Sequence, residues 1–117
     1  MKKYLDFSIL KGKTITKVET DKYDYIKFWC SDGTKYGMSH EQDCCESVSI
    51  EDIDGDLNDL VGGVVVDAYQ SSEEGDTDWG TSTWTFYRIT GGKGTIVIRW
   101  FGESNGYYSE GVDFYEL

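Results

Sequence analysis

The sequence predicts an α+β domain that is mainly β, built as a curved antiparallel sheet of six to eight strands with one short helix against it. Segments that alternate β-branched or aromatic residues with polar ones recur along the chain. Two dipeptides with a strong hairpin preference separate pairs of these segments, and proline is absent. The length of 117 residues suits one core, so residues 1–117 are expected to form a single domain.

The first half of the chain is expected to supply four strands and the helix. The strands are predicted at residues 13–19, 24–30, 34–40 and 45–50. Asp32-Gly33 should form a two-residue hairpin turn, because both positions tolerate positive φ. Residues 54–61 read DGDLNDLV, and their Asp cap, their apolar side chains and the two glycines that follow predict a short helix.

The second half is expected to be strand-rich around one loop. A strand is predicted at residues 64–69, and the polar, acidic segment 71–82 is predicted to be a mobile loop. Three further strands are expected at 83–89, 95–102 and 107–115, the last two joined by a hairpin at Asn105-Gly106. Glu103 and Glu110 flank that turn, and we expect them to be solvated hairpin ends rather than a catalytic carboxylate pair.

Negative charge is concentrated in the middle of the chain. The net charge is −11, residues 41–87 contain no Lys or Arg, and 13 acidic residues fall between positions 41 and 78. Such a field repels nucleic acid and membrane surfaces and attracts basic partners, although solubility alone is the alternative explanation. The residues expected to contact a basic partner are Glu51, Asp52, Asp54, Asp56, Asp59, Glu73, Glu74, Asp76 and Trp79.

The composition points to the cytosol. The mean hydropathy is −0.50 and no apolar run is long enough to span a membrane. Asp6 and Lys11 interrupt the N-terminal apolar residues, so a secretory signal peptide is not expected. Three cysteines, two of them adjacent, argue against a disulfide framework.

The segment HEQDCCES predicts a structural zinc site. It contains the only histidine, His40, followed closely by Cys44 and Cys45. Imidazole and thiolate are ligands that zinc prefers, and a His-x3-Cys spacing lets one short loop wrap a single ion. The fourth position would fall to Asp43, to a distant carboxylate or to water. The alternative is that Cys44 is a small buried hydrophobe and that the other two residues are incidental.

Cys30 is expected to belong to the core and not to the zinc site. Across the predicted hairpin, Cys30 lies beside the turn, whereas His40 pairs about 16 Å further along the strands. The alternation of side chains also places the two residues on opposite faces of the sheet.

Several strings of the sequence resemble a family of small proteins of phages, prophages and their bacterial hosts that is described as a domain of unknown function. These strings are HEQDCCESVSIEDI, GDLNDLVG, WTFYRI and RWFGESNGYYSEGVDFYEL, and the resemblance extends from about residue 15 to the C-terminus. It implies a mobile-element origin and a single-domain protein. Related phage proteins include anti-CRISPR proteins that act on type II effector nucleases, some of them metal-containing.

We therefore expect a non-enzymatic, phage-encoded inhibitor in the cytoplasm of a bacterial host. Its carboxylates would occupy the basic groove of a nucleic-acid-handling defence protein, such as a type II CRISPR effector nuclease, and block its DNA binding or loading. One alternative is a small metalloenzyme that combines the His40 cluster with Glu103, Asn105 and Tyr107. Another is a nucleotide-sequestering protein, which would require Arg88 and Arg99 to line a pocket.

Overall fold

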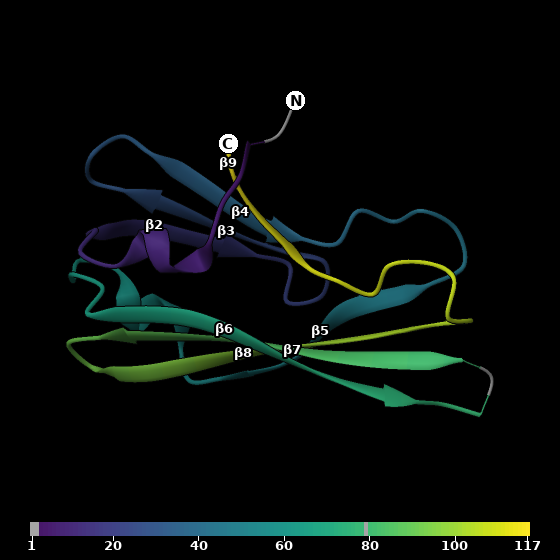
Figure 1. Ribbon diagram of the computed structural model, residues 1–117. Helices are drawn as coiled ribbons and strands as arrows, with labels where there is room; N and C mark the ends of the chain where they lie inside the picture. Colours follow the sequence, from purple (N-terminus) through teal and green to yellow (C-terminus); the bar gives the residue numbers. More distant parts are fainter. Residues whose placement is uncertain (1–2, 79) are drawn as a thin grey trace.

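Two antiparallel sheets pack face to face in the computed structural model, which describes residues 3–78 and 80–117 (Figure 1). The first sheet has the order β1-β9-β4-β3-β2 and comprises β1 (Lys3–Tyr4), β2 (Ile15–Thr20), β3 (Tyr25–Cys30), β4 (Lys35–Ser39) and β9 (Asp113–Glu116). The second has the order β5-β8-β7-β6 and comprises β5 (Ser47–Asp54), β6 (Asp67–Asp76), β7 (Thr81–Gly91) and β8 (Gly94–Ser104). The predicted mainly β, antiparallel architecture is confirmed, with the strands divided between two sheets.

The core fills the space between the sheets, because successive side chains of a strand point to opposite faces. Phe28 of β3 and Met38 of β4 face inward from the first sheet, and Tyr87, Ile98 and Trp100 face inward from the second. Cys30 is also buried in this core, as its position beside the hairpin turn predicts.

A single 3-10 turn, η1 (Phe7–Leu10), closes one side of the core. Its first residue, Phe7, makes edge contacts with Tyr87 and Phe114, at centroid distances of 4.9 and 5.2 Å. The Tyr87 hydroxyl donates to the Val112 carbonyl oxygen at 3.2 Å. Burial raises the pKa of this phenol above its ordinary value, so Tyr87 is a neutral donor at any physiological pH.

The helix predicted over residues 54–61 is only one 3-10 turn, η2 (Leu57–Leu60). Gly55 and Gly62 adopt φ values of 110° and 87°, and these turns leave no room for a longer helix. The predicted Asp cap exists, but it is Asp56, whose side chain accepts a hydrogen bond from the Asn58 backbone N–H at 2.9 Å.

The segment predicted as a mobile loop over residues 71–82 is largely strand. Most of it belongs to β6 and to the start of β7, which pair in continuous register from Asp67↔Thr90 to Asp76↔Thr81. Residues 69–76 are exposed on both faces of the sheet, so the polar composition reflects exposure and not a lack of structure.

The hairpin predicted at Asn105-Gly106 is wrong. Strands β3 and β4 do pair around Asp32-Gly33, but the loop is longer than the predicted two residues: Tyr25 lies opposite Ser39 and not His40, and of the two turn residues only Gly33 has positive φ. After β8 the chain leaves the second sheet, and β9 pairs with β4 and β1 in the first sheet. Among the described residues the chain passes between the sheets twice, through a first crossing segment (residues 40–46) and a second crossing segment (residues 105–112).

Gly102 fixes how closely the second crossing segment approaches β8. A Cβ at this position would lie 2.9 Å from the Glu110 carbonyl oxygen and 2.9 Å from Val48 Cγ2. Gly102→Ala should therefore lower the free energy of unfolding by about 1–3 kcal/mol, the usual cost of overpacking. Urea titration would measure this loss. Gly92→Ala is the matched control because a Cβ at Gly92 meets no atom within 4 Å, and an equal loss in both variants would contradict the prediction.

Candidate functional site

The outer face of the second sheet is the candidate functional surface. Tyr87 and Ile89 of β7 point into the core, so their neighbours Trp84, Phe86 and Arg88 point away from the first sheet. The register places Phe101 opposite Trp84, Arg99 opposite Phe86, and Tyr69 opposite Arg88. The first sheet lies on the other side of these strands (Figure 1). We call the six residues Tyr69, Trp84, Phe86, Arg88, Arg99 and Phe101 the aromatic face.

The rings and guanidinium groups of the aromatic face contact one another. The centroids of Trp84 and Phe101 are 4.4 Å apart, and the Arg99 guanidinium lies 5.6 Å from the Trp84 ring. Arg88 lies 5.2 Å from the ring of Phe86 and 5.6 Å from that of Tyr69. The arginine–ring contacts have cation–π geometry. Tyr69 is exposed, and the other members of the aromatic face are half-buried. The result is a continuous apolar surface with fixed cations.

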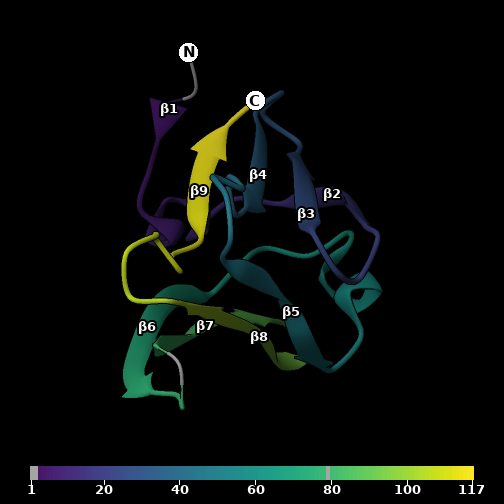
Figure 2. The same ribbon diagram turned by 90° about the vertical axis from the view of Figure 1, so that its right-hand side faces the viewer.

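The predicted acidic contact residues lie at the two edges of the same sheet. Figure 2 shows β5 and β6 on opposite sides of the sheet, which corresponds to three strand spacings, or about 14 Å. The β5 group consists of Glu51, Asp52 and Asp54 with Asp56 and Asp59 beside η2; the β6 group consists of Glu73, Glu74 and Asp76. Trp79 lies outside the described residues. The acidic segment therefore flanks the aromatic face in two groups and does not form one patch.

Part of the β5 group is held by an arginine of the aromatic face. Arg99 Nε lies 2.5 Å from Glu51 Oε2, and Arg99 Nη2 lies 3.7 Å from Asp52 Oδ2. The two carboxylates and the guanidinium are all about half exposed, so these ion pairs orient the side chains more than they stabilise the fold.

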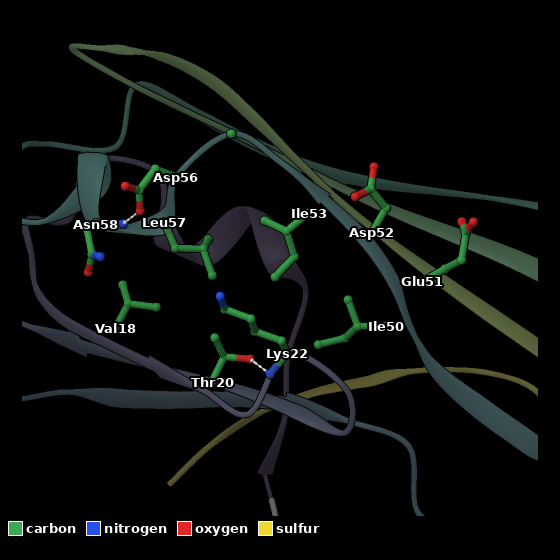
Figure 3. A pocket seen from close by; sticks show the side chains of 11 residues that line it. Val18, Thr20, Lys22, Ile50, Glu51, Asp52, Ile53, Asp56, Leu57 and Asn58 are labelled. Atoms are coloured by element: carbon green, nitrogen blue, oxygen red, sulfur yellow. Dashed lines mark hydrogen bonds between the residues drawn. The ribbon is translucent and has the colours of Figure 1, made fainter.

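A cleft of about 560 Å³ opens between β5 and β2, next to the same acidic residues (Figure 3). Its floor is apolar and includes Val18, Ile53 and Leu57. Charged residues also line it: the Lys22 side chain points in among the apolar residues, whereas Glu51 and Asp52 point away from them (Figure 3). The aliphatic stem of a basic side chain, that of Lys22, thus already lies against the apolar floor.

The histidine of the predicted zinc site is buried and joins the two crossing segments. His40 Nδ1 lies 2.7 Å from the Gly111 carbonyl oxygen, which can only accept, so this nitrogen carries a proton. His40 Nε2 lies 3.8 Å from Glu46 Oε1, and both side chains are almost completely buried. Within the described chain, His40 Nε2 and Glu46 Oε2 have no hydrogen-bond partner.

Glu46 stays ionised in this buried position. Burial raises the pKa of its carboxyl group, but the backbone N–H groups of Asp43 and Cys44 donate to Oε1 at 2.8 and 3.0 Å and, together with His40, bring the net pKa below the ordinary value. Sequence reasoning did not identify Glu46 as a member of this cluster.

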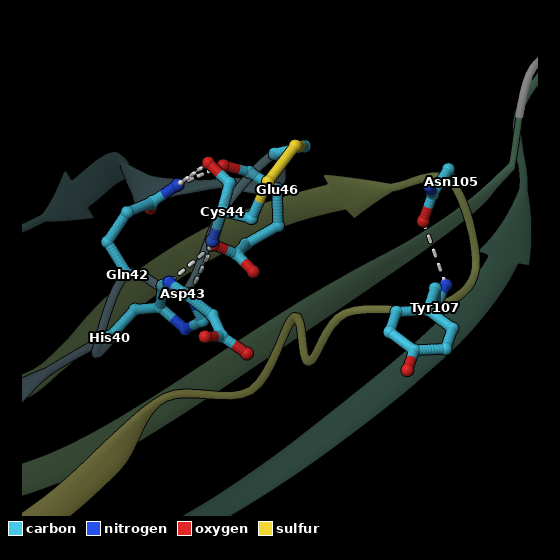
Figure 4. The surroundings of a disulfide bond; sticks show 8 residues. His40, Gln42, Asp43, Cys44, Glu46, Asn105 and Tyr107 are labelled. Atoms are coloured by element: carbon cyan, nitrogen blue, oxygen red, sulfur yellow. Dashed lines mark hydrogen bonds and ion pairs between the residues drawn. A yellow bond between two sulfur atoms is a disulfide. The ribbon is translucent and has the colours of Figure 1, made fainter.

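The two neighbouring cysteines are joined to each other, which adds a local bond but no disulfide framework. Cys44 and Cys45 form a disulfide whose sulfur atoms point away from His40 (Figure 4). No set of three His, Cys, Asp or Glu side chains among residues 3–78 and 80–117 is placed to hold a metal ion. The zinc site with His40, Asp43, Cys44 and Cys45 stays a prediction that concerns the reduced protein.

The metalloenzyme alternative places Glu103, Asn105 and Tyr107 in one cleft with His40, but the cleft at His40 is lined by other residues, among them Glu41, Asp43, Ser109 and Asp113. Asn105 and Tyr107 lie apart from His40 in Figure 4, and Tyr107 is 82% exposed. The Asn105 side chain accepts the Tyr107 backbone N–H at 3.0 Å, which is a local turn contact. Glu103 lies on β8 opposite Ser47 of β5.

If zinc binds this cluster, it requires the two free thiolates. The protein purified under reducing conditions should then contain about one zinc ion per chain, as measured by elemental mass spectrometry. Cys44→Ser and Cys45→Ser should each lose the ion, while Cys30→Ser, which alters only a core cysteine, should keep it. Zinc-free reduced protein would refute the zinc site.

Glu110, expected to be a solvated hairpin end, is instead buried and anchors the second crossing segment. Its carboxylate accepts hydrogen bonds from the hydroxyls of Thr81 at 2.5 Å, Thr83 at 2.9 Å, and Ser104. Burial raises the pKa of this carboxyl group. The hydrogen bonds from the three hydroxyls lower the pKa by more than burial raises it, so the net pKa lies below the ordinary value of 4.5.

This anchor predicts a pH-dependent stability difference. Because the folded pKa of Glu110 is depressed, its contribution is present above pH 4.5 and is lost as the pH falls through the folded value. Glu110→Gln should lower the free energy of unfolding by about 1–3 kcal/mol at neutral pH and by progressively less in acid. Thermal unfolding across this pH range measures the difference. The control Glu103→Gln should be nearly neutral; a Glu110→Gln loss that is the same at every pH would contradict this role.

The sequence contains an indication of the aromatic face that the sequence analysis did not take into account. Both alternate sets of the segment TWTFYRI contain aromatic residues, so neither set is marked as the polar, solvent-facing one. A strand that is apolar on both faces needs a packing partner on each face, and the first sheet packs against only one of them.

Comparison with known proteins identifies the family. The family model described as a domain of unknown function, DUF7448, matches residues 8–114, so the chain belongs to this family. No curated protein and no solved structure matches it. Within the described chain, no helix is both long enough and apolar enough to cross a lipid bilayer.

Proposed function

We propose that this DUF7448 chain binds a basic protein partner through the aromatic face and the two acidic edges beside it, and so inhibits that partner. The observation that supports the proposal most directly is the position of the aromatic face between the β5 and β6 acidic groups. Trp, Tyr and Arg are the residue types that most often dominate binding energy at protein interfaces. A polar, charged rim around such a centre is the usual anatomy of an interface.

Each part of this surface has a distinct task in the proposal. The rings of Trp84, Phe86 and Phe101 supply the buried apolar area and stack with Lys or Arg side chains of the partner. The carboxylates at the two edges steer a basic partner and fix its orientation, which raises the association rate more than the affinity.

We infer that the partner is a nucleic-acid-handling host protein, with a type II CRISPR effector nuclease as the target class. The negative field supports this inference, because carboxylates can occupy Lys and Arg residues that otherwise hold the phosphate backbone. The sequence resemblance to small phage and prophage proteins supports a phage origin and action in the cytoplasm of a bacterial host. The protein acts by occupancy in this proposal and carries out no reaction.

The aromatic face also raises the question of a nucleotide ligand, since Arg88 and Arg99 lie beside stacking rings. Arg99, however, already pairs with Glu51 and Asp52. Neither arginine lines the cleft next to β5, and the surrounding carboxylates repel phosphate. The geometry therefore favours a basic protein over an anionic nucleotide.

Binding to a purified, guide-loaded type II effector nuclease tests the proposal. We expect the protein to bind the effector and to suppress its DNA cleavage, with an affinity that falls as salt rises from about 50 to about 500 mM. Trp84→Ala should weaken binding by about thirtyfold or more, as loss of a hot-spot side chain costs about 2 kcal/mol. Tyr23→Ala removes an exposed aromatic side chain outside the aromatic face and should bind normally. Binding that does not depend on salt, or binding by Trp84→Ala as tight as that of the unmodified chain, would contradict the proposal.

A further inference from the structure

We propose that the free edge of β6 takes up an extended, basic segment of the partner as an additional antiparallel or parallel strand. This inference rests on the proposed function, because it names the form in which the basic partner meets the acidic edge. Strand addition is a common mode of peptide recognition, in which main-chain hydrogen bonds supply affinity and side chains supply specificity.

Strand β6 is an edge strand, paired with β7 on one side only. The Thr77 N–H donates to the Gly80 carbonyl oxygen at 2.9 Å, in register with the ladder, so the odd-numbered residues of β6 direct their backbone groups to β7. The even-numbered residues Gln70, Ser72 and Glu74 consequently direct their N–H and C=O groups outward. These groups make no other backbone hydrogen bond within the described chain.

The outward edge is accessible over the second half of the strand. Residues 69–76 are all exposed, whereas Ala68 is buried where η1 packs near the start of β6. In Figure 1 this second half extends beyond η1, and Figure 2 shows it at the outer side of the sheet. An exposed run of this length can pair with about four to six residues of another chain.

The charge on β6 selects which strand can pair. Glu73 lies on the same face as the aromatic face, and Glu74 and Asp76 lie on the opposite face. Edge charges usually prevent a protein from pairing with copies of itself, and three carboxylates do so here by mutual repulsion. An added strand that carries Lys or Arg is instead attracted by the carboxylates on both faces of the sheet. We infer that the edge excludes a second copy and admits a basic segment.

A peptide and a proline substitution test this edge. The probe is a capped peptide of about ten residues that alternates lysine and valine; its control carries the same charges but is N-methylated at alternate residues, which removes the N–H donors on one side. We expect the probe to bind, with slowed amide exchange at Gln70, Ser72 and Glu74. Two such control peptides exist, one methylated at the odd and one at the even positions. One of the two should bind at least about tenfold more weakly than the probe, because it lacks the N–H groups that face β6. Equal binding in both registers would overturn the proposal in favour of charge attraction alone.

The protein variant uses the outward direction of the Ser72 backbone. Ser72→Pro removes an N–H that makes no ladder bond, so the fold should be retained while strand addition is blocked. Ser72→Ala keeps the N–H and is the matched control, expected to bind like the unmodified chain. If Ser72→Pro and Ser72→Ala bind the effector nuclease equally while Trp84→Ala does not, the edge proposal fails and the proposed function stands. If no variant binds the effector but the lysine peptide still adds to the edge, the target is wrong and the edge stands.

Discussion

The alternation of side chains along β7 and β8 is the constraint from which the other features follow. Both faces of these strands carry large apolar side chains, but the first sheet covers only one of them. Burial of Tyr87, Ile98 and Trp100 therefore leaves Trp84 and Phe101 at the surface, where they contact each other and Arg99. A protein of this size rarely keeps such a surface without a use for it, which is why we assign the binding role to this face.

The negative charge opposes self-association at the exposed surfaces. An apolar face and a long free edge are both surfaces on which β proteins aggregate. Carboxylates border the aromatic face on both sides and follow β6 itself, so two copies repel each other at the surfaces that would otherwise join them. In the proposed function, the same charges that oppose self-association attract the basic partner.

The sequence predicted local features well and long-range pairing poorly. The Asp32-Gly33 turn, the buried position of Cys30 and the strands on either side of them follow from local propensity and alternation. The Asn105-Gly106 turn failed because Glu110 and Gly102 hold the following residues against β8 while β9 continues to the other sheet. The later part of β6 was missed because its partner β7, and not its own composition, gives it structure.

The most distinctive strings of the sequence, QDCCES and GESNGYYSE, cover most of the two crossing segments. Each contains a buried glutamate that holds its segment in place: Glu46 accepts two backbone N–H groups, and Glu110 accepts three hydroxyls. His40 then joins the two segments through the Gly111 carbonyl oxygen. Residue types that suggest a metal or catalytic site in the sequence thus have a structural task in the fold. They connect the sheets on one side of the core, and this leaves the outer face and the edges of the second sheet available for the proposed binding function.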